Sequence, residues 1–174
     1  AADHVRKEDA GEPSVSRICP DCQMASDFFR DSEIRTLADS LRKRGVEVVP
    51  VMPYIFRDNA EKVFESMAHD MFEFPLDGMM IRNYESFSFL KKHKFDKRII
   101  LDHNLYVFNR HAKQFWRDLG VEEFTVPAEL SADEMETMGM NGCALTVYGR
   151  FPVMVTAQCI RKTVSECTGR KGIL

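Results

Sequence analysis

The sequence predicts an α/β fold built from repeated strand–helix units that form a parallel sheet. Short, nearly continuous apolar runs alternate along the chain with segments whose apolar residues recur at helical spacing. Such continuous runs are typical of strands that are buried on both faces of a parallel sheet. Because only six runs are found, fewer than the eight strands of a closed barrel, we expect an open parallel sheet or a partial, distorted TIM-barrel-like fold. The predicted strands lie at residues 15–20, 46–52, 79–81, 98–101, 123–126 and 144–148.

The segments between these runs carry the start and stop signals of helices. Ser32 is predicted to be the N-cap of the first helix, and Gly45 follows its end. Asp58 is predicted to cap the second helix. Ser131 and Glu134 have the spacing of a capping box, in which side chain and backbone satisfy each other at the helix start. We expect the helices after the first at residues 58–67, 85–93, 109–119 and 131–138.

The length and composition of the chain fit one folded domain. Apolar residues make up 44% of the 174 residues and charged residues 29%, as in ordinary globular proteins. Residues 1–13 are polar and charged, and we expect a linker or a chain end there. Residues 14–174 are predicted to form a single βα-repeat domain. The incomplete set of strands suggests that this domain is a segment of a longer protein. The rest of that protein would then be the domain's partner.

The charge of the chain argues against general nucleic-acid binding, with one local exception. The net charge is −3, so no positive field surrounds the whole molecule. The segment from residue 150 to the end, however, has five basic residues against one acidic residue. Such a segment is either a solvated tail or a basic binding surface.

The sequence also predicts a cytoplasmic protein that does not associate with a membrane. No apolar run approaches the roughly 20 residues that cross a bilayer, and the polar start does not resemble a signal peptide. The five cysteines are an odd number, which argues against a complete disulfide framework and favours a reducing compartment.

Polar side chains follow the predicted strands at the positions where α/β folds place their ligands. Asp102 and Glu129 are the candidates for catalytic acid and base, provided that the fold brings them together. His103 alone is a weak candidate. The remaining residues of this set would bind a polar or anionic substrate, although each of them could instead cap a helix or satisfy loop backbone. The predicted substrate-binding residues are Arg57, Arg82, Asn83, Asn104, Asn109, Tyr148 and Arg150.

Common hydrolase motifs are absent from the sequence. There is no HExxH zinc motif, no GxSxG nucleophile turn and no glycine-rich phosphate loop. A cysteine nucleophile would need a histidine partner in space, and the sequence leaves that possibility open.

Two cysteines lie within the basic segment, and two more form a CxxC pair near the start of the chain. Cys159 and Cys167 could be half of a four-cysteine iron–sulfur ligand set. Cys19 and Cys22 fit a zinc knuckle, a redox pair or simple buried thiols. The seven residues between Cys159 and Cys167 do not match the spacing of a second zinc knuckle, which argues against zinc.

Five segments in order resemble the collagenase-like peptidase family U32, and in particular the C-terminal barrel segment of its large members. They cover residues 53–57, 78–83, 101–109, 126–130 and 148–154, followed by Cys159. The similarity extends from about Val46 to Cys167. The resemblance implies a TIM-barrel-like α/β fold and the peptidase activity in the family's name. Some members are described as collagenases, whereas others act in tRNA or rRNA base hydroxylation or in oxygen-independent quinone hydroxylation.

The resemblance leaves three functional hypotheses open. The first is a peptidase acting on a peptide or protein substrate. The second is an iron–sulfur-dependent RNA-modification protein, since those relatives carry a four-iron four-sulfur cluster and Cys159 and Cys167 match its first two ligands. The other two ligands are absent from the chain, so a cluster is expected in the full-length protein and not in this segment alone. The third hypothesis is a non-catalytic module of a larger enzyme.

Overall fold

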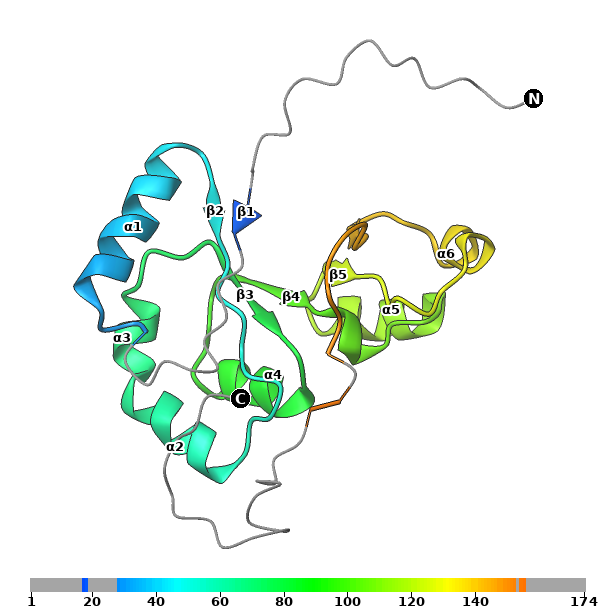
Figure 1. The fold of residues 1–174 in the computed structure, drawn as a ribbon. Coiled ribbons are helices and arrows are strands. Elements are labelled where there is room, and N and C mark those ends of the chain that lie inside the picture. The colour runs from blue at the N-terminus through cyan, green and yellow to red at the C-terminus, as the bar shows by residue number, and fades with distance from the viewer. Residues whose placement is uncertain (1–16, 19–27, 153, 156–174) are drawn as a thin grey trace, which may run out of the picture.

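Six short parallel strands alternate with helices along the chain in the computed structural model, which describes residues 17, 18, 28–152, 154 and 155 (Figure 1). Each strand lies in or next to one of the predicted apolar runs, so the predicted α/β class and parallel strands are confirmed. The bounds of the strands are β1 Arg17–Ile18, β2 Glu47–Val48, β3 Gly78–Ile81, β4 Arg98–Leu101, β5 Glu123–Thr125 and β6 Cys143–Ala144. Four strands, β1, β2, β5 and β6, are shorter than predicted, whereas β4 has the predicted bounds and β3 begins one residue earlier.

The strands are arranged in the same order in space as along the chain. β1 pairs with β2, and β3, β4, β5 and β6 form a second sheet in that order, with every pair parallel. The two sheets are linked just after β2, where a parallel bridge joins Val51 to Met80. Met52 N donates to Met80 O at 2.8 Å, and Met80 N donates to Pro50 O at 2.9 Å. Within the described residues the strands do not close into a barrel. The predicted TIM-barrel-like character of the fold is therefore not confirmed.

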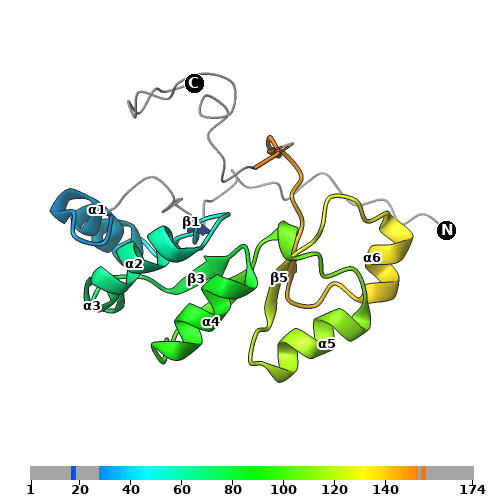
Figure 2. The same ribbon diagram turned by 90° about the horizontal axis from the view of Figure 1, so that it is seen from below.

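The helices connect successive strands, and α2, α4 and α5 lie side by side on one side of the strands (Figure 2). The short helix α3 and the single 3₁₀ turn η1 were not predicted. Both are too short to show a periodic apolar pattern in the sequence. The bounds are α1 Ser32–Lys43, α2 Asp58–Ser66, α3 Ala68–Phe72, α4 Tyr84–Lys92, η1 His103–Leu105, α5 Arg110–Asp118 and α6 Ala132–Met138.

Helix starts follow the predicted chemistry, with two corrections. Asp31, and not Ser32, is the N-cap of α1, because its carboxylate accepts from the backbone N–H groups of Glu33 and Ile34 at 2.8 and 3.1 Å. A carboxylate is also favoured there by the helix dipole. Asp58 does not occupy the N-cap position, which is taken by Arg57 with no side-chain cap. The predicted capping box at the start of α6 is confirmed.

Aromatic side chains fill the space between the helices and the strands. Phe29 packs edge to face against Phe64 and Phe74, and Trp116 on α5 is 1% exposed. The predicted apolar stripes are only partly buried, since Leu37 on α1 and Phe115 on α5 are more than half exposed. Exposed apolar side chains on otherwise packed helices are common, because polar residues cannot cover a whole protein surface.

A closed ring of four ion pairs joins the amino-terminal ends of four strands. Arg17 donates to Glu47 at 2.6 Å and to Glu123 at 2.8 Å. Arg98 donates to the same two carboxylates, at 2.6 and 2.9 Å. Each of these residues is the first of its strand, so the ring connects β1 and β2 with β4 and β5. Gly78 begins the intervening strand β3, where a Cβ atom would lie 2.8 Å from Arg98 O.

Removal of one carboxylate from this ring is expected to lower stability. Glu123→Gln takes an ion pair from both Arg17 and Arg98, while the neighbouring Glu122 makes no ion pair with the described residues. We expect the free energy of unfolding to fall by about 1 kcal/mol at low salt, because the side chains are partly exposed. The loss should shrink at high salt, which screens the ring. Urea unfolding at both salt concentrations measures this.

Glu122→Gln is the matched control, because it removes the same charge one residue away. Equal unfolding free energies for the two variants at low salt would contradict a stabilising role of the ring.

Candidate functional site

The loops that follow β2, β3 and β4 are tied together by polar side chains at the carboxyl-terminal edge of the sheet. Asn83 Nδ2 donates to the backbone oxygens of Pro53 and Tyr54, at 2.8 and 3.1 Å. Asn104 Nδ2 donates to Arg82 O at 2.9 Å. Residues from three separate strand ends therefore meet, as expected because parallel strands all end at the same edge.

Asp102 lies at the centre of this edge and is 7% exposed. Its Oδ2 atom accepts from Arg82 Nε at 2.8 Å, in an ion pair that joins the ends of β3 and β4. The Arg82 guanidinium lies over the Tyr54 ring, with its central carbon 3.9 Å from the ring centroid. A planar, delocalised cation suits both contacts at once. The arginine therefore brings a permanent positive charge to a nearly buried carboxylate.

His103 is held by the other oxygen of the same carboxylate. Asp102 Oδ1 accepts from the backbone N–H of His103 and from its Nδ1, both at 2.8 Å. Nδ1 donates the ring proton to this carboxylate, and in the neutral form of the imidazole Nε2 then carries the lone pair. No recorded contact with the described residues occupies Nε2. The ring also lies edge-on to Phe151, with centroids 4.9 Å apart, so the segment after β6 reaches this site.

The charge of Asp102 is stabilised by its neighbours. Burial by itself would raise the pKa of the Asp102 carboxyl. The hydrogen bonds from Arg82 and from the side chain and backbone of His103 outweigh burial, so the pKa lies below its ordinary value. Asp102 is therefore ionised at neutral pH, which makes it an acceptor that orients the imidazole and not an acid that gives up a proton.

Glu129, the second predicted catalytic carboxylate, does not join this network. It is exposed in the turn between β5 and α6, and it makes no hydrogen bond or ion pair with any residue that the structure describes. Both oxygens of Asp102 are already engaged by Arg82 and His103. The pairing of Asp102 with Glu129 stays a prediction.

Two of the predicted substrate-binding asparagines cap helices. Asn83 Oδ1 accepts from Ser86 N at 2.8 Å, at the start of α4. Asn109 Oδ1 accepts from Ala112 N at 2.9 Å, at the start of α5. These contacts match the alternative that such residues cap helices, because an N-cap asparagine satisfies an otherwise unpaired backbone N–H.

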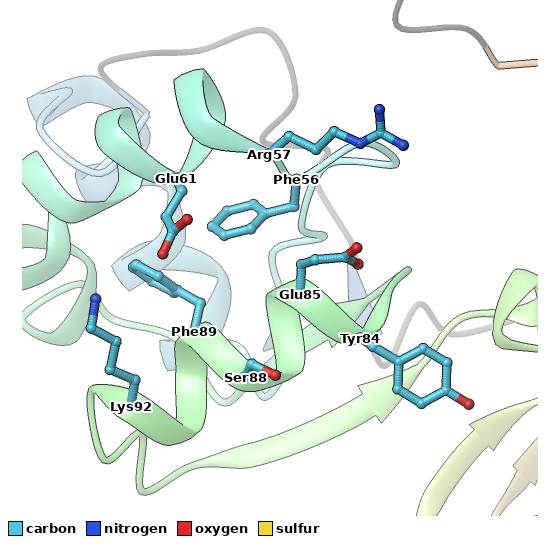
Figure 3. A pocket seen from close by; sticks show the side chains of 8 residues that line it. All are labelled: Phe56, Arg57, Glu61, Tyr84, Glu85, Ser88, Phe89 and Lys92. Carbon is cyan, nitrogen blue, oxygen red and sulfur yellow. The ribbon is translucent and has the colours of Figure 1, made fainter.

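Arg57 lines a groove between α2 and α4 that contains neither Asp102 nor His103 (Figure 3). The groove has a volume of about 660 Å³. Figure 3 shows the Arg57 guanidinium pointing away from Glu61 and Lys92. The groove is lined by Phe56, Arg57, Glu61, Tyr84, Glu85, Ser88, Phe89 and Lys92.

Tyr148 and Arg150 are exposed on the segment that follows β6. Tyr148 is 96% exposed. Arg150 directly precedes Phe151, whose ring contacts His103. The same segment that carries these two predicted residues therefore reaches the Asp102–His103 pair.

The cysteines that are candidates for metal binding lie outside the described residues. They are Cys159 and Cys167 and the CxxC pair of Cys19 and Cys22. In the part of the chain that is described, no group of three or more His, Cys, Asp or Glu side chains is placed to hold a metal ion. The described residues alone thus offer no such ligand set, and the cluster stays a prediction.

A family model described as Peptidase family U32 matches residues 21–172. The chain belongs to peptidase family U32. The match confirms the resemblance in the sequence and includes Arg82, Asp102, His103 and Arg150. Neither the search of curated proteins nor that of solved structures gave a match. Among the described helices of this U32 chain, none has both the length and the apolar character needed to cross a membrane.

His103 is the site residue that sequence reasoning undervalued. A single histidine in a loop gives little signal, and only the structure shows its contact with Asp102, its neighbour in the chain. The available clue was an Asp-His pair directly after a buried apolar strand, at the edge where α/β folds bind ligands.

Asp102→Asn is expected to destabilise the protein by about 3 kcal/mol at neutral pH, because it breaks a nearly buried ion pair and removes the charge that accepts from Arg82 and His103. Equilibrium denaturant unfolding measures the change. Asp96→Asn is the matched control, since Asp96 is exposed and makes no ion pair with the described residues. A loss no larger than that of the control would contradict the central role of the Asp102 charge.

The same ion pair predicts how stability depends on pH. The folded-state pKa of Asp102 is lowered, so its contribution is fully present above the unfolded-state value of about 3.9. The contribution is lost as the pH falls through the folded-state pKa. The difference in unfolding free energy between wild type and Asp102→Asn should therefore be constant near neutral pH and shrink in acid. A difference that grows on acidification would contradict the assignment.

Proposed function

We propose that this chain carries the hydrolytic site of a peptidase, in which the Asp102–His103 pair activates water against a peptide bond. The observation that carries the proposal is the 2.8 Å hydrogen bond between His103 Nδ1 and Asp102 Oδ1 at the carboxyl edge of the sheet. Membership of peptidase family U32 supports a peptide as the substrate class.

In this proposal His103 is the general base. Its Nε2 atom takes a proton from a water molecule as the water oxygen attacks the peptide carbonyl. Asp102 holds the imidazole in the required tautomer and stabilises the imidazolium that forms. The proton then passes from Nε2 to the departing amine as the C–N bond breaks. Water is proposed as the nucleophile because, among the described residues, His103 makes no hydrogen bond with a hydroxyl or thiol group.

Arg82 and Arg150 have different roles in the proposal. Arg82 is a positioning residue, since its guanidinium is occupied by Asp102 and Tyr54 and keeps the carboxylate ionised. Arg150 is exposed and adjacent to Phe151, and in this proposal it binds a carbonyl or carboxylate oxygen of the substrate. Tyr148, on the same segment, would add a further contact.

The proposal includes a structural context for the site. Six parallel strands in chain order, with connecting helices between them, support an open segment of a TIM-barrel-like fold. Further strands and loops of a parent protein would then complete the rim around Asp102 and His103. In this picture the rest of that protein is the partner, and the site faces its loops.

His103→Gln is expected to reduce hydrolysis of fluorescently labelled gelatin by about 100-fold or more, because glutamine cannot accept and return the proton. His111→Gln is the matched control, since His111 is exposed at the start of α5. The rate of peptide release, with circular dichroism to check the fold, measures the effect. Equal loss in both variants would contradict the general-base role.

The same assay distinguishes the iron-dependent alternative. Hydrolysis that continues after iron chelation and fails in His103→Gln supports the peptidase. An absence of gelatin hydrolysis by the folded wild-type protein, together with salt-sensitive RNA binding that is lost in Arg150→Ala, would overturn the proposal and favour RNA modification.

A further inference from the structure

Lys113 on α5 is a buried cation, 3% exposed, with no carboxylate partner among the described residues. Its Nζ atom donates to Gly139 O at 2.5 Å and lies 5.6 Å from the centroid of the Phe124 ring. A buried ammonium is costly unless a nearby group carries the opposite charge. The contacts with the carbonyl and the aromatic ring compensate for only part of that cost.

The free thiol of Cys143 lies within hydrogen-bond distance of the same ammonium. Lys113 Nζ is 3.2 Å from Cys143 Sγ. An ammonium beside a sulfur stabilises the thiolate, which is the nucleophilic form of cysteine. The thiol is therefore the one group among the recorded contacts of Lys113 that can supply a negative charge.

The backbone holds Cys143 at this position. It is the first residue of β6, aligned with Phe124 of β5, and its N–H donates to Met140 O at 3.0 Å. Gly142 precedes it with φ +74°, and a Cβ atom there would lie 2.3 Å from Glu122 O. Only glycine fits this close approach of two strands, so the turn sets the position of the thiol.

Cys143 is only partly buried. It is one of the residues that line a hollow of about 350 Å³. The hollow also contacts Arg17 and Glu123, members of the ion-pair ring. Peroxides are small and polar enough to enter such a space.

We propose that Cys143 and Lys113 form a peroxide-sensitive modification site, separate from the Asp102–His103 pair. The Cys143 thiolate attacks one oxygen of hydrogen peroxide, and the O–O bond breaks as the S–O bond forms. The hydrogen on the attacked oxygen passes to the departing hydroxide, which leaves as water. Sulfur is oxidised to a sulfenate and the peroxide is reduced. Lys113 stabilises the thiolate before the reaction and the sulfenate after it.

A purely structural role for Lys113 is the alternative. Gly139 is the C-cap of α6, and a lysine that donates to a helix-terminal carbonyl is favoured by the helix dipole. Arg117, one turn further along α5, binds the same loop through Asn141 O at 3.3 Å. This role predicts a stabilising lysine and a thiol of ordinary reactivity.

The test measures oxidation of Cys143 in the full chain. Wild type and variants are treated with hydrogen peroxide and dimedone, and the adduct is quantified on the peptide that contains residue 143 by mass spectrometry. Lys113→Met should slow adduct formation about fivefold or more, whereas Lys113→Arg should retain most of the rate. Lys62→Met removes an exposed helical lysine from α2 and should have no effect.

Unchanged oxidation of Cys143 in folded Lys113→Met would overturn the proposal and leave Lys113 with its capping role. A second measurement covers a variant that fails to fold. In wild type, Cys143 should react faster with peroxide in the native protein than in urea, despite its partial burial. Slower reaction in the native state would overturn the proposal. Neither result depends on whether gelatin is cleaved.

Discussion

Asp102 brings a negative charge into the carboxyl-terminal edge of the sheet, and the side chains around it stabilise that charge. Arg82 supplies the counter-ion, Tyr54 covers the guanidinium, and His103 binds the second oxygen. A carboxylate at this depth would otherwise favour its neutral form. The network thus joins the loops after β2, β3 and β4, and it fixes the orientation of the imidazole. Both the local structure and the proposed chemistry of this edge depend on that one charge.

The two ends of the sheet have different tasks. At the amino-terminal ends, Arg17, Glu47, Arg98 and Glu123 form a closed ring in which each member has two ion-pair partners. At the carboxyl-terminal ends, His103 Nε2 has no recorded contact with the described residues. This division is typical of parallel βα folds, where one edge supports stability and the other carries the chemistry. Cys143 begins β6 and so lies at the amino-terminal end of the strands, which separates the proposed oxidation from the proposed hydrolysis.

Much of the fold could be predicted because its signals are local. Apolar runs marked the six strands, the alternation with helices predicted parallel pairing, and the Ser131–Glu134 spacing predicted a capping box that the structure confirms. Family membership also followed from ordered local segments. Predictions failed where the pattern was too short or too degenerate. The residues of α3 and η1 are too few to show a helical repeat of apolar residues. Asp31 and Ser32 are both residue types that favour the N-cap position, so backbone geometry decided which of them occupies it.

The sequence by itself determined the fold class, the family and the positions at which polar side chains follow the strands. Tertiary structure alone decided which of those side chains meet. It joined Arg82 to Asp102 and brought Phe151 to His103, while it left Glu129 exposed and used Asn83 and Asn109 as helix caps. It also placed Lys113 beside Cys143, thirty residues apart along the chain. The physical reason is that a hydrogen bond or ion pair depends on separations of about 3 Å in space, and spacing along the chain does not fix these for residues on different strands and helices.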